Sequence, residues 1–147
     1  MKIIVPDTSA LARLYVPDGP IPEGLEEAVN AAWRGEIVLV VPELALAEFV
    51  QVLWKKEQAG YLRSLEVDEI VAAFMELPLE IVGHKDFLIN ALSLSRRYGL
   101  TVYDSLFLSV AVSKSAKLLT ADQQLQKAFE QIQEGISQFL NSSIQNP

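Results

Sequence analysis

The chain has 147 residues, half of them hydrophobic, with 12 basic and 19 acidic side chains and no cysteine. This length predicts one domain over residues 1–147, and the apolar content excludes an intrinsically disordered chain. The lack of cysteine excludes disulfide bridges, thiolate metal centres and cysteine nucleophiles, and the net charge of −7 argues against indiscriminate binding to nucleic acid or anionic lipid.

Short apolar runs of strand character alternate along the chain with longer stretches of helical period. The runs of strand character are 2–6, 37–41, 79–82 and 117–120. The stretches of helical character are 22–34, 43–58, 64–75, 85–98, 103–116 and 122–131. This alternation is typical of a parallel sheet covered by helices, so the pattern predicts an α/β fold. No run is long enough to span a bilayer and the first residues lack a secretory-signal pattern, so we expect a cytoplasmic protein without membrane contact.

Two aspartates directly follow predicted strands. Asp7 comes after the run 2–6, and Asp122 comes after Leu118-Leu119-Thr120-Ala121. Ligands of open α/β sheets bind at the carboxyl ends of the strands, which makes both residues candidates for a site. Aspartate is also a preferred helix N-cap, and a helix is predicted after each residue, so position alone leaves a capping role open for both.

Two further acids lie inside predicted helices, on faces that should be buried. Glu48 has apolar neighbours three and four positions away, and Asp104 lies against Phe107 and Leu108. An ionised carboxylate in apolar surroundings is costly unless it is paired or fully hydrogen-bonded, so each residue implies a partner. A buried salt bridge is the simple alternative to a functional role. The cations nearest in sequence are Lys55, Lys56, Arg96 and Arg97.

The four acids, two at strand ends and two on apolar helix faces, need a counter-charge if they meet, because neighbouring carboxylates raise one another's pKa. A hard divalent cation fits, since Mg²⁺ takes one or two carboxylates and keeps several waters, and Mn²⁺ fits equally well. The chemistry expected of such a site is phosphodiester hydrolysis. Hydroxyl groups stand beside the acids in sequence, at Thr8, Ser9, Ser105 and Thr120.

Four segments together resemble the PIN domain family, and in particular the ribonuclease toxins of VapBC-type toxin–antitoxin pairs. The segments are Val5-Pro6-Asp7-Thr8-Ser9-Ala10-Leu11, Pro42-Glu43-Leu44-Ala45-Leu46-Ala47-Glu48-Phe49, Leu100-Thr101-Val102-Tyr103-Asp104-Ser105-Leu106-Phe107-Leu108 and Leu118-Leu119-Thr120-Ala121-Asp122. Each segment alone is a weak motif, but their order and spacing agree with the family over residues 1 to about 131.

The resemblance implies a three-layer α/β/α fold with a central, mostly parallel sheet of four to five strands. It also implies a Mg²⁺-dependent endoribonuclease, with RNA as substrate, an antitoxin protein as partner and a homodimer as the assembly. By the family's pattern Asp7 and Asp104 bind the metal directly, and Glu48 and Asp122 complete the acidic pocket, so all four are the expected catalytic residues and metal ligands. Thr120 is expected as a supporting hydroxyl that holds a carboxylate or a water.

Three features depart from the family's pattern. The fifth strand is visible only faintly, at 136–140. Glu43 is a second acid on the predicted helix that holds Glu48. A carboxylate at the start of a helix is stabilised by the helix dipole, which explains Glu43 without a role in the pocket, so we prefer Glu48 there. Basic residues are spread thinly, so weak, salt-sensitive or shape-selective RNA binding is expected.

Other functions remain to be weighed against this one. The strongest alternative is a PIN-like module that mainly docks a protein partner, because a mean hydropathy of +0.23 suggests a covered apolar patch. An aspartyl-phosphate phosphatase is disfavoured because Ser9 stands where that class has a second aspartate. His84 is expected to be a solvated loop residue, and Trp33, Trp54 and Tyr61 are expected in the core or at an interface rather than stacked on bases.

Overall fold

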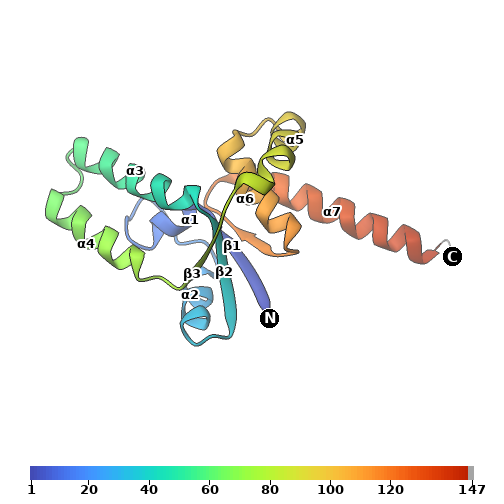
Figure 1. Ribbon diagram of the computed structural model, residues 1–147, viewed down its shortest axis with the longest axis horizontal. Helices are drawn as coiled ribbons and strands as arrows, with labels where there is room; N and C mark the ends of the chain where they lie inside the picture. The colour runs from blue at the N-terminus through green and yellow to red at the C-terminus, as the bar shows by residue number, and fades with distance from the viewer. Residues whose placement is uncertain (146–147) are drawn as a thin grey trace.

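The computed structural model describes residues 1–145, and it shows strands and helices alternating along the chain (Figure 1). The strands are β1 (Lys2–Pro6), β2 (Ile37–Pro42), β3 (Leu79–Val82) and β4 (Lys117–Leu119). The helices are α1 (Thr8–Arg13), α2 (Leu25–Trp33), α3 (Leu44–Gln58), α4 (Ser64–Met75), α5 (Leu88–Tyr98), α6 (Val102–Ser113) and α7 (Gln123–Gln145), with a 3₁₀ turn η1 (Lys85–Phe87) before α5. The predicted elements are therefore confirmed with small shifts at their ends, except that α7 is much longer than the predicted stretch 122–131.

The four strands form one sheet in the order β3-β2-β1-β4. Each neighbouring pair is parallel, which confirms the predicted parallel sheet. β1 is hydrogen-bonded on both sides, to β2 and to β4, whereas β4 lies at an edge. The carboxyl ends of β1 and β4 consequently lie side by side, and the backbone N–H of Asp7 donates to Leu119 at 3.0 Å across them.

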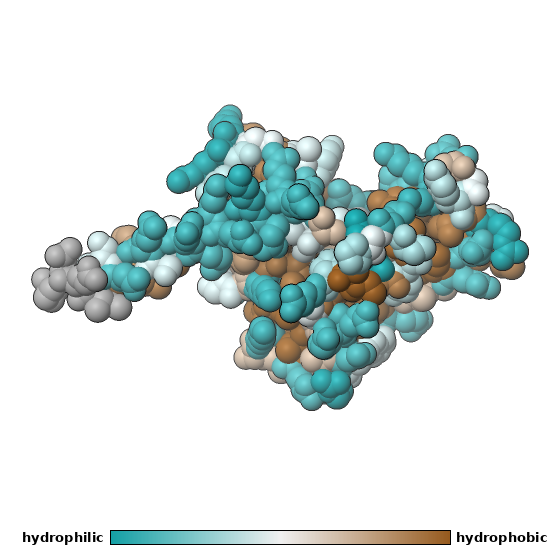
Figure 2. Space-filling view, turned by 180° about the vertical axis from the view of Figure 1, so that it is seen from behind, coloured by the Kyte–Doolittle hydropathy of each residue, from teal (hydrophilic) through white to brown (hydrophobic). Residues whose placement is uncertain are grey.

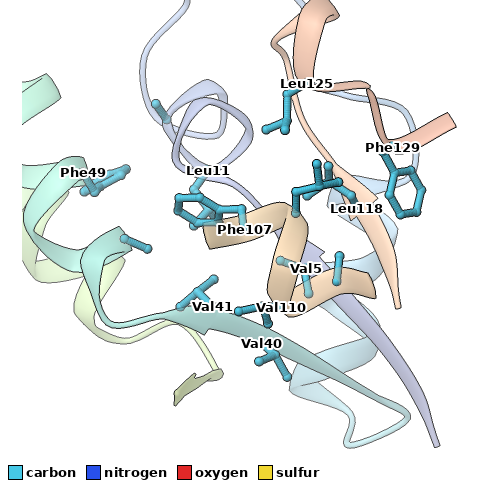
Figure 3. Packing of buried hydrophobic residues seen from close by; sticks show 14 of the residues in the cluster. Val5, Leu11, Val40, Val41, Phe49, Phe107, Val110, Leu118, Leu125 and Phe129 are labelled. Atoms are coloured by element: carbon cyan, nitrogen blue, oxygen red, sulfur yellow. The ribbon is translucent and has the colours of Figure 1, made fainter. Parts of the chain in front are cut away.

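Helices cover both faces of the sheet, as the alternation of strand residues requires. Val5, Val40 and Leu118 belong to the larger core cluster, while their neighbours Ile4, Leu39 and Leu119 belong to a smaller cluster with Leu25 of α2. In Figure 3, Phe107 of α6 lies within the larger cluster, with Leu11, Val41 and Leu118 around it. Helices on each face make the three layers that the resemblance implies.

The fifth strand expected at 136–140 is wrong, because these residues belong to α7. Ile132, Ile136, Phe139 and Leu140 recur at spacings of three and four, which is the period of a helix and not of a strand. The last helix therefore continues well past Gln131, where the sequence pattern had ended it. Within residues 1–145, no helix combines the length and the apolar character needed to cross a membrane.

Candidate active site

The candidate site lies where β1 and β4 end, with α3 and α6 contributing one acid each. Asp7 follows β1 directly and caps α1, and Asp122 stands between β4 and α7. Glu48 is in the second turn of α3, and Asp104 is the third residue of α6. Segments that are far apart in sequence thus contribute their acids to one end of the sheet. Ligands of parallel sheets bind at the carboxyl ends of the strands, and the sequence analysis predicted a site there.

Asp7 is held by three hydrogen-bond donors although its side chain is buried, with 4% of the residue exposed. Its Oδ1 accepts from the Ser9 hydroxyl at 2.7 Å and from the Ala10 backbone N–H at 2.9 Å, and its Oδ2 accepts from the Thr120 hydroxyl at 2.5 Å. Burial raises the pKa of Asp7, and the charge of Asp104 adds to this, while the three hydrogen bonds oppose it. Both carboxylate oxygens are therefore fixed by the ends of two adjacent strands.

Ser9 and Thr120 link the loops that follow β1 and β4. The Ser9 hydroxyl, which donates to Asp7, accepts from the Ala121 backbone N–H at 3.0 Å. The Thr120 hydroxyl, which donates to the other oxygen of Asp7, accepts from the Asp122 N–H at 3.0 Å. Since each hydroxyl has one proton and gives it to Asp7, these two bonds favour the carboxylate form of Asp7 and oppose the effect of burial on its pKa.

Glu48 lies partly buried on α3 and faces the same region. The Thr8 hydroxyl donates to Glu48 Oε1 at 2.8 Å, so the residue after Asp7 positions the next acid. Burial is the largest cause of the raised pKa of Glu48, and the charges of Asp104 and Asp7 raise it further. Glu43, the alternative acid at the start of α3, is exposed, which agrees with the preference for Glu48.

Asp104 lies in the first turn of α6, where the helix dipole favours a carboxylate. Thr101 caps this helix, since its hydroxyl oxygen accepts from the Asp104 backbone N–H at 3.1 Å. Burial raises the pKa of Asp104, and the neighbouring charge of Asp122 raises it further. Asp104 is thereby coupled electrostatically to each of the other three acids.

Asp122 is the N-cap of α7, because its Oδ1 accepts from the backbone N–H groups of Gln124 at 2.9 Å and Leu125 at 3.1 Å. Asp7 also caps its helix, through Ala10. The capping interpretation is therefore correct for both strand-end aspartates. It does not compete with a role in the site, since both carboxylates also influence the pKa of another acid there.

The buried salt bridges considered for Glu48 and Asp104 are absent from the part of the chain that the structure describes. The ion pairs there are Arg34–Glu36, Lys56–Asp18 and Arg63–Glu66. Lys56, two turns beyond Glu48, donates to Asp18 at 2.7 Å and so points toward the loop after α1. The negative charges of the site are consequently not balanced by any of these cations.

The side chains of the site suit a hard divalent cation, because they offer only carboxylate and hydroxyl oxygens. The pKa values of Asp7, Glu48 and Asp104 are raised, and none of these acids has a cationic partner among the described residues. Within residues 1–145, no three or more acidic, histidine or cysteine side chains lie close enough to hold a metal ion by themselves. Mg²⁺ requires fewer protein ligands than that, since one or two carboxylates with waters suffice. The residues present therefore fit such an ion.

Thr8 and Ser9 are the residues whose roles the sequence did not reveal. Their place after Asp7 was visible, but which acid each hydroxyl binds depends on the packing of α3 and β4.

His84 also differs from expectation, because it is partly buried and its Nδ1 has no hydrogen-bond partner among the described residues.

The core alternative for the three large aromatic residues is wrong. Trp33, Trp54 and Tyr61 are 57%, 47% and 76% exposed.

The fold and the site together define a parallel α/β protein with four acidic side chains at one end of its sheet. A model of the PIN domain family matches residues 4–130. Ribonuclease VapC3 of Pyrobaculum aerophilum is 34% identical over 131 residues, covering 88% of this chain and 95% of that protein. The chain belongs to the PIN domain family.

Two solved structures share this fold. PAE2754 from Pyrobaculum aerophilum superposes with a TM-score of 0.58 at 20% identity, covering 86% of this chain and 84% of the other. VapC20 from Mycobacterium tuberculosis, described as a toxin that cleaves the sarcin–ricin loop, gives 0.58 at 15% identity, covering 85% and 94%. At these identities the similarity establishes the fold, which agrees with the predicted PIN-like architecture.

Proposed function

We propose that this chain is a metal-dependent endoribonuclease, the toxin of a toxin–antitoxin pair, acting as one domain over residues 1–147 in the cytoplasm. The observation that carries the proposal is the meeting of Asp7, Glu48, Asp104 and Asp122 at one end of the sheet without a cationic partner among the described residues. The relative named as a ribonuclease supports the reaction class.

In this proposal Asp7 and Asp104 hold the cation directly, and Glu48 and Asp122 complete the pocket. A bound Mg²⁺ or Mn²⁺ would supply an activated water and offset the charge of the scissile phosphate. Ser9 and Thr120 keep both Asp7 oxygens in place, so this ligand is oriented before any ion binds. Such preorganisation reduces the cost of ordering the site when RNA arrives.

Glu48 and Asp122 are suited to handling the attacking water and its proton. Thr8 binds Oε1 of Glu48, and Oε2 accepts no hydrogen bond from the residues that the structure describes. The raised pKa of Glu48 brings it closer to neutrality, which favours proton transfer at physiological pH. Asp122 Oδ1 is occupied by the cap of α7, which leaves its other oxygen for a water.

RNA, an antitoxin and a second copy of the chain are the proposed partners. Because the basic residues are spread thinly and phosphate contacts supply most non-specific affinity, RNA binding is expected to be weak, salt-sensitive or shape-selective. Large apolar side chains are exposed on several helices, among them Trp54 of α3, Leu65 of α4 and Ile89 of α5. Exposed apolar surface of this kind indicates protein partners.

The test is cleavage of a mixed cellular RNA pool by the purified chain with Mg²⁺ or Mn²⁺. We expect discrete cuts that disappear with EDTA and with Asp104→Asn. Glu43→Gln is the matched control, since it neutralises an exposed acid at the start of α3 and should leave the cuts unchanged. Cuts that persist in EDTA would contradict the metal dependence, and full activity of Asp104→Asn would contradict the assignment of the site.

The second candidate is a PIN-like module that docks a protein without cleaving RNA. The exposed aromatic residues Trp33, Trp54 and Tyr61 favour it, because a catalytic role does not account for them. The same assay separates the candidates: absence of cleavage with either metal, together with stable capture of a small protein encoded beside this one, would favour the module.

A further inference from the structure

A polar cavity adjoins the four acids at the start of α7. Its volume is about 430 Å³, within the range of about 300–1,000 Å³ that is usual for small-ligand pockets. Thr120 and Asp122 line the cavity and also belong to the candidate site, where the Thr120 hydroxyl donates to Asp7. The rest of the lining is Ala121 and the first two turns of α7. A ligand in this cavity would therefore lie directly beside the candidate active site.

The walls of this cavity are polar. Ala121 is the one apolar residue among the described residues that line it, and the α7 residues there are Gln123, Gln126, Lys127 and Glu130. In the view from behind, hydrophilic residues predominate where α7 meets the rest of the protein (Figure 2). The cores of protein–protein interfaces are depleted in charged residues and enriched in aromatic ones. The lining therefore favours a polar ligand over a packed protein surface.

Lys127 gives the cavity a positive charge that is not used elsewhere. The residue is exposed, and the ion pairs found within residues 1–145 do not include it. It follows Asp122 by five positions, which corresponds to about 7.5 Å along a helix axis. The proposed reaction brings a phosphodiester chain to the four acids, so Lys127 is well placed for a neighbouring phosphate of the same strand. Lysine contacts to phosphates add affinity without regard to sequence.

Gln126 and Glu130 offer hydrogen-bonding groups of the kind that bind a base. Nε2 of Gln126 donates to Oε1 of Glu130 at 3.1 Å, which orients the amide. Gln126 retains its carbonyl oxygen and a second N–H for a ligand, and the carboxylate of Glu130 can only accept. Adenine, cytosine and guanine each carry an exocyclic amino group that such acceptors can bind, whereas uracil carries none. The pair therefore favours a base with an amino group over uracil.

We propose that this cavity is a nucleotide subsite for the RNA strand. Lys127 binds a phosphate next to the scissile one, and Gln126 and Glu130 bind a neighbouring base that carries an exocyclic amino group. The inference rests on the proposed function, since it needs an RNA strand at the four acids. It extends that function in two ways: it supplies a cation beside the acids in a chain of net charge −7, and it predicts a base preference beside the cut.

The first test measures RNA binding without cleavage, by fluorescence anisotropy of a labelled mixed-sequence single-stranded RNA in EDTA. We expect Lys127→Gln to raise the dissociation constant about 3- to 10-fold. The slope of its logarithm against the logarithm of salt concentration should fall by about 0.7, as for the loss of one phosphate contact on a single strand. Lys127→Arg keeps the charge and should bind RNA as the wild type does.

Lys2→Gln is the matched control, because it removes the same charge from another exposed lysine. Lys2 begins β1 and so lies at the amino end of that strand, whereas the acids lie beyond the carboxyl ends. The control should leave both the dissociation constant and the salt slope close to those of the wild type. Circular dichroism of Lys127→Gln checks that the helix is kept, as expected from the similar helix propensities of lysine and glutamine.

The second test determines the bases beside the cuts, by sequencing the ends of RNA cleaved with Mg²⁺. We expect the wild type to disfavour uridine at one position near the cut. Gln126→Met keeps the length of the side chain but removes the amide, so it should weaken this preference by about 5-fold or more. Lys127→Gln should raise KM, leave kcat unchanged and keep the base preference, because the lysine binds only phosphate.

The outcomes separate this proposal from the proposed function. The subsite is overturned if Lys127→Gln and Lys2→Gln bind RNA equally well, if the wild type binds no RNA, or if Gln126→Met keeps the cut preference of the wild type. Equal RNA binding by the two lysine variants would assign Lys127 to another partner, such as a protein. If Lys127 contributes to RNA binding but the wild type cleaves nothing with Mg²⁺ or Mn²⁺, the result counts against the proposed function alone.

Discussion

The loops after β1 and β4 carry the same local pattern, an aspartate between a strand and a helix, yet they hold that aspartate differently. Asp7 is 4% exposed, and both of its oxygens accept hydrogen bonds, from Ser9, Ala10 and Thr120. Asp122 is partly exposed, and only one of its carboxylate oxygens accepts hydrogen bonds from the described residues, in both cases as the N-cap of α7.

The difference follows from the strand order and not from the local sequence. β1 lies inside the sheet with a neighbour on each side, whereas β4 lies at an edge. The end of β1 is therefore enclosed by groups from β4 and α3, and its aspartate becomes a fixed part of the site. At the edge the aspartate stays open to solvent, so Asp122 is the acid with more freedom to adjust to a ligand.

The largest expected effect is on catalysis by Asp7→Asn compared with Asp122→Asn. The amide nitrogen of asparagine cannot accept the hydroxyl bonds from Ser9 or Thr120, and a proposed metal ligand is lost, so we expect kcat/KM to fall by about 100-fold or more. Asp122→Asn should cost about 10-fold, as expected for a group that supports the ligands. The measurement is cleavage of a defined RNA with Mg²⁺, and equal losses would contradict the distinction between the two loops.

Much of this arrangement could be predicted from the sequence because its signals are local. Strand-type runs gave β1 and β4, and an aspartate directly after each placed two acids at the same end of a parallel sheet. Glu48 and Asp104 were recognisable as acids on apolar helix faces. Each of these inferences needs only the period of the pattern and the cost of burying a charge.

The rest depends on contacts between distant segments. Thr8 binds Glu48, forty positions away, and Ser9 accepts from Ala121, so neither role could be assigned before α3 and β4 were placed. The misassigned strand at 136–140 has another cause, because a short apolar run suits either a strand or a helix until its period is counted over a longer window. The exposure of Trp54 likewise depends on which helices cover α3.

A second prediction concerns the link between the two loops. Thr120→Val removes the hydroxyl that donates to Asp7 and accepts from the Asp122 N–H, so it leaves a buried acceptor and a backbone donor unpaired. We expect the free energy of unfolding to fall by about 1–3 kcal/mol, measured by urea denaturation in EDTA. Thr120→Ser should restore most of the loss. A stable Thr120→Val variant would show that the loops do not depend on this link.

A third prediction uses the pH dependence of stability without metal. The pKa values of Asp7, Glu48 and Asp104 lie above the ordinary values of 3.8 and 4.5, so the folded chain binds these protons more tightly than the unfolded chain. Their contribution to stability is therefore present at low pH and is lost as the pH rises through the raised pKa values.

Asp104→Asn isolates this contribution, because the variant cannot ionise at this position. Relative to the wild type, its free energy of unfolding should rise as the pH increases from about 4 to 7 in EDTA. Added Mg²⁺ should stabilise the wild type at neutral pH and affect the variant less. A difference between the two chains that is constant with pH would contradict the raised pKa of Asp104.

The smallest expected effect separates the two roles of Asp122. Asp122→Ala removes the acceptor for the N–H groups of Gln124 and Leu125, so it should lower the free energy of unfolding by about 1 kcal/mol. Asparagine is as good an N-cap as aspartate, so Asp122→Asn should keep the stability of the wild type while it loses the charge beside Asp104. Equal losses of thermal stability in Asp122→Ala and Asp122→Asn would show that the charge of Asp122 stabilises α7. The cleavage defect of Asp122→Asn would then include a loss of stability as well as a loss at the site.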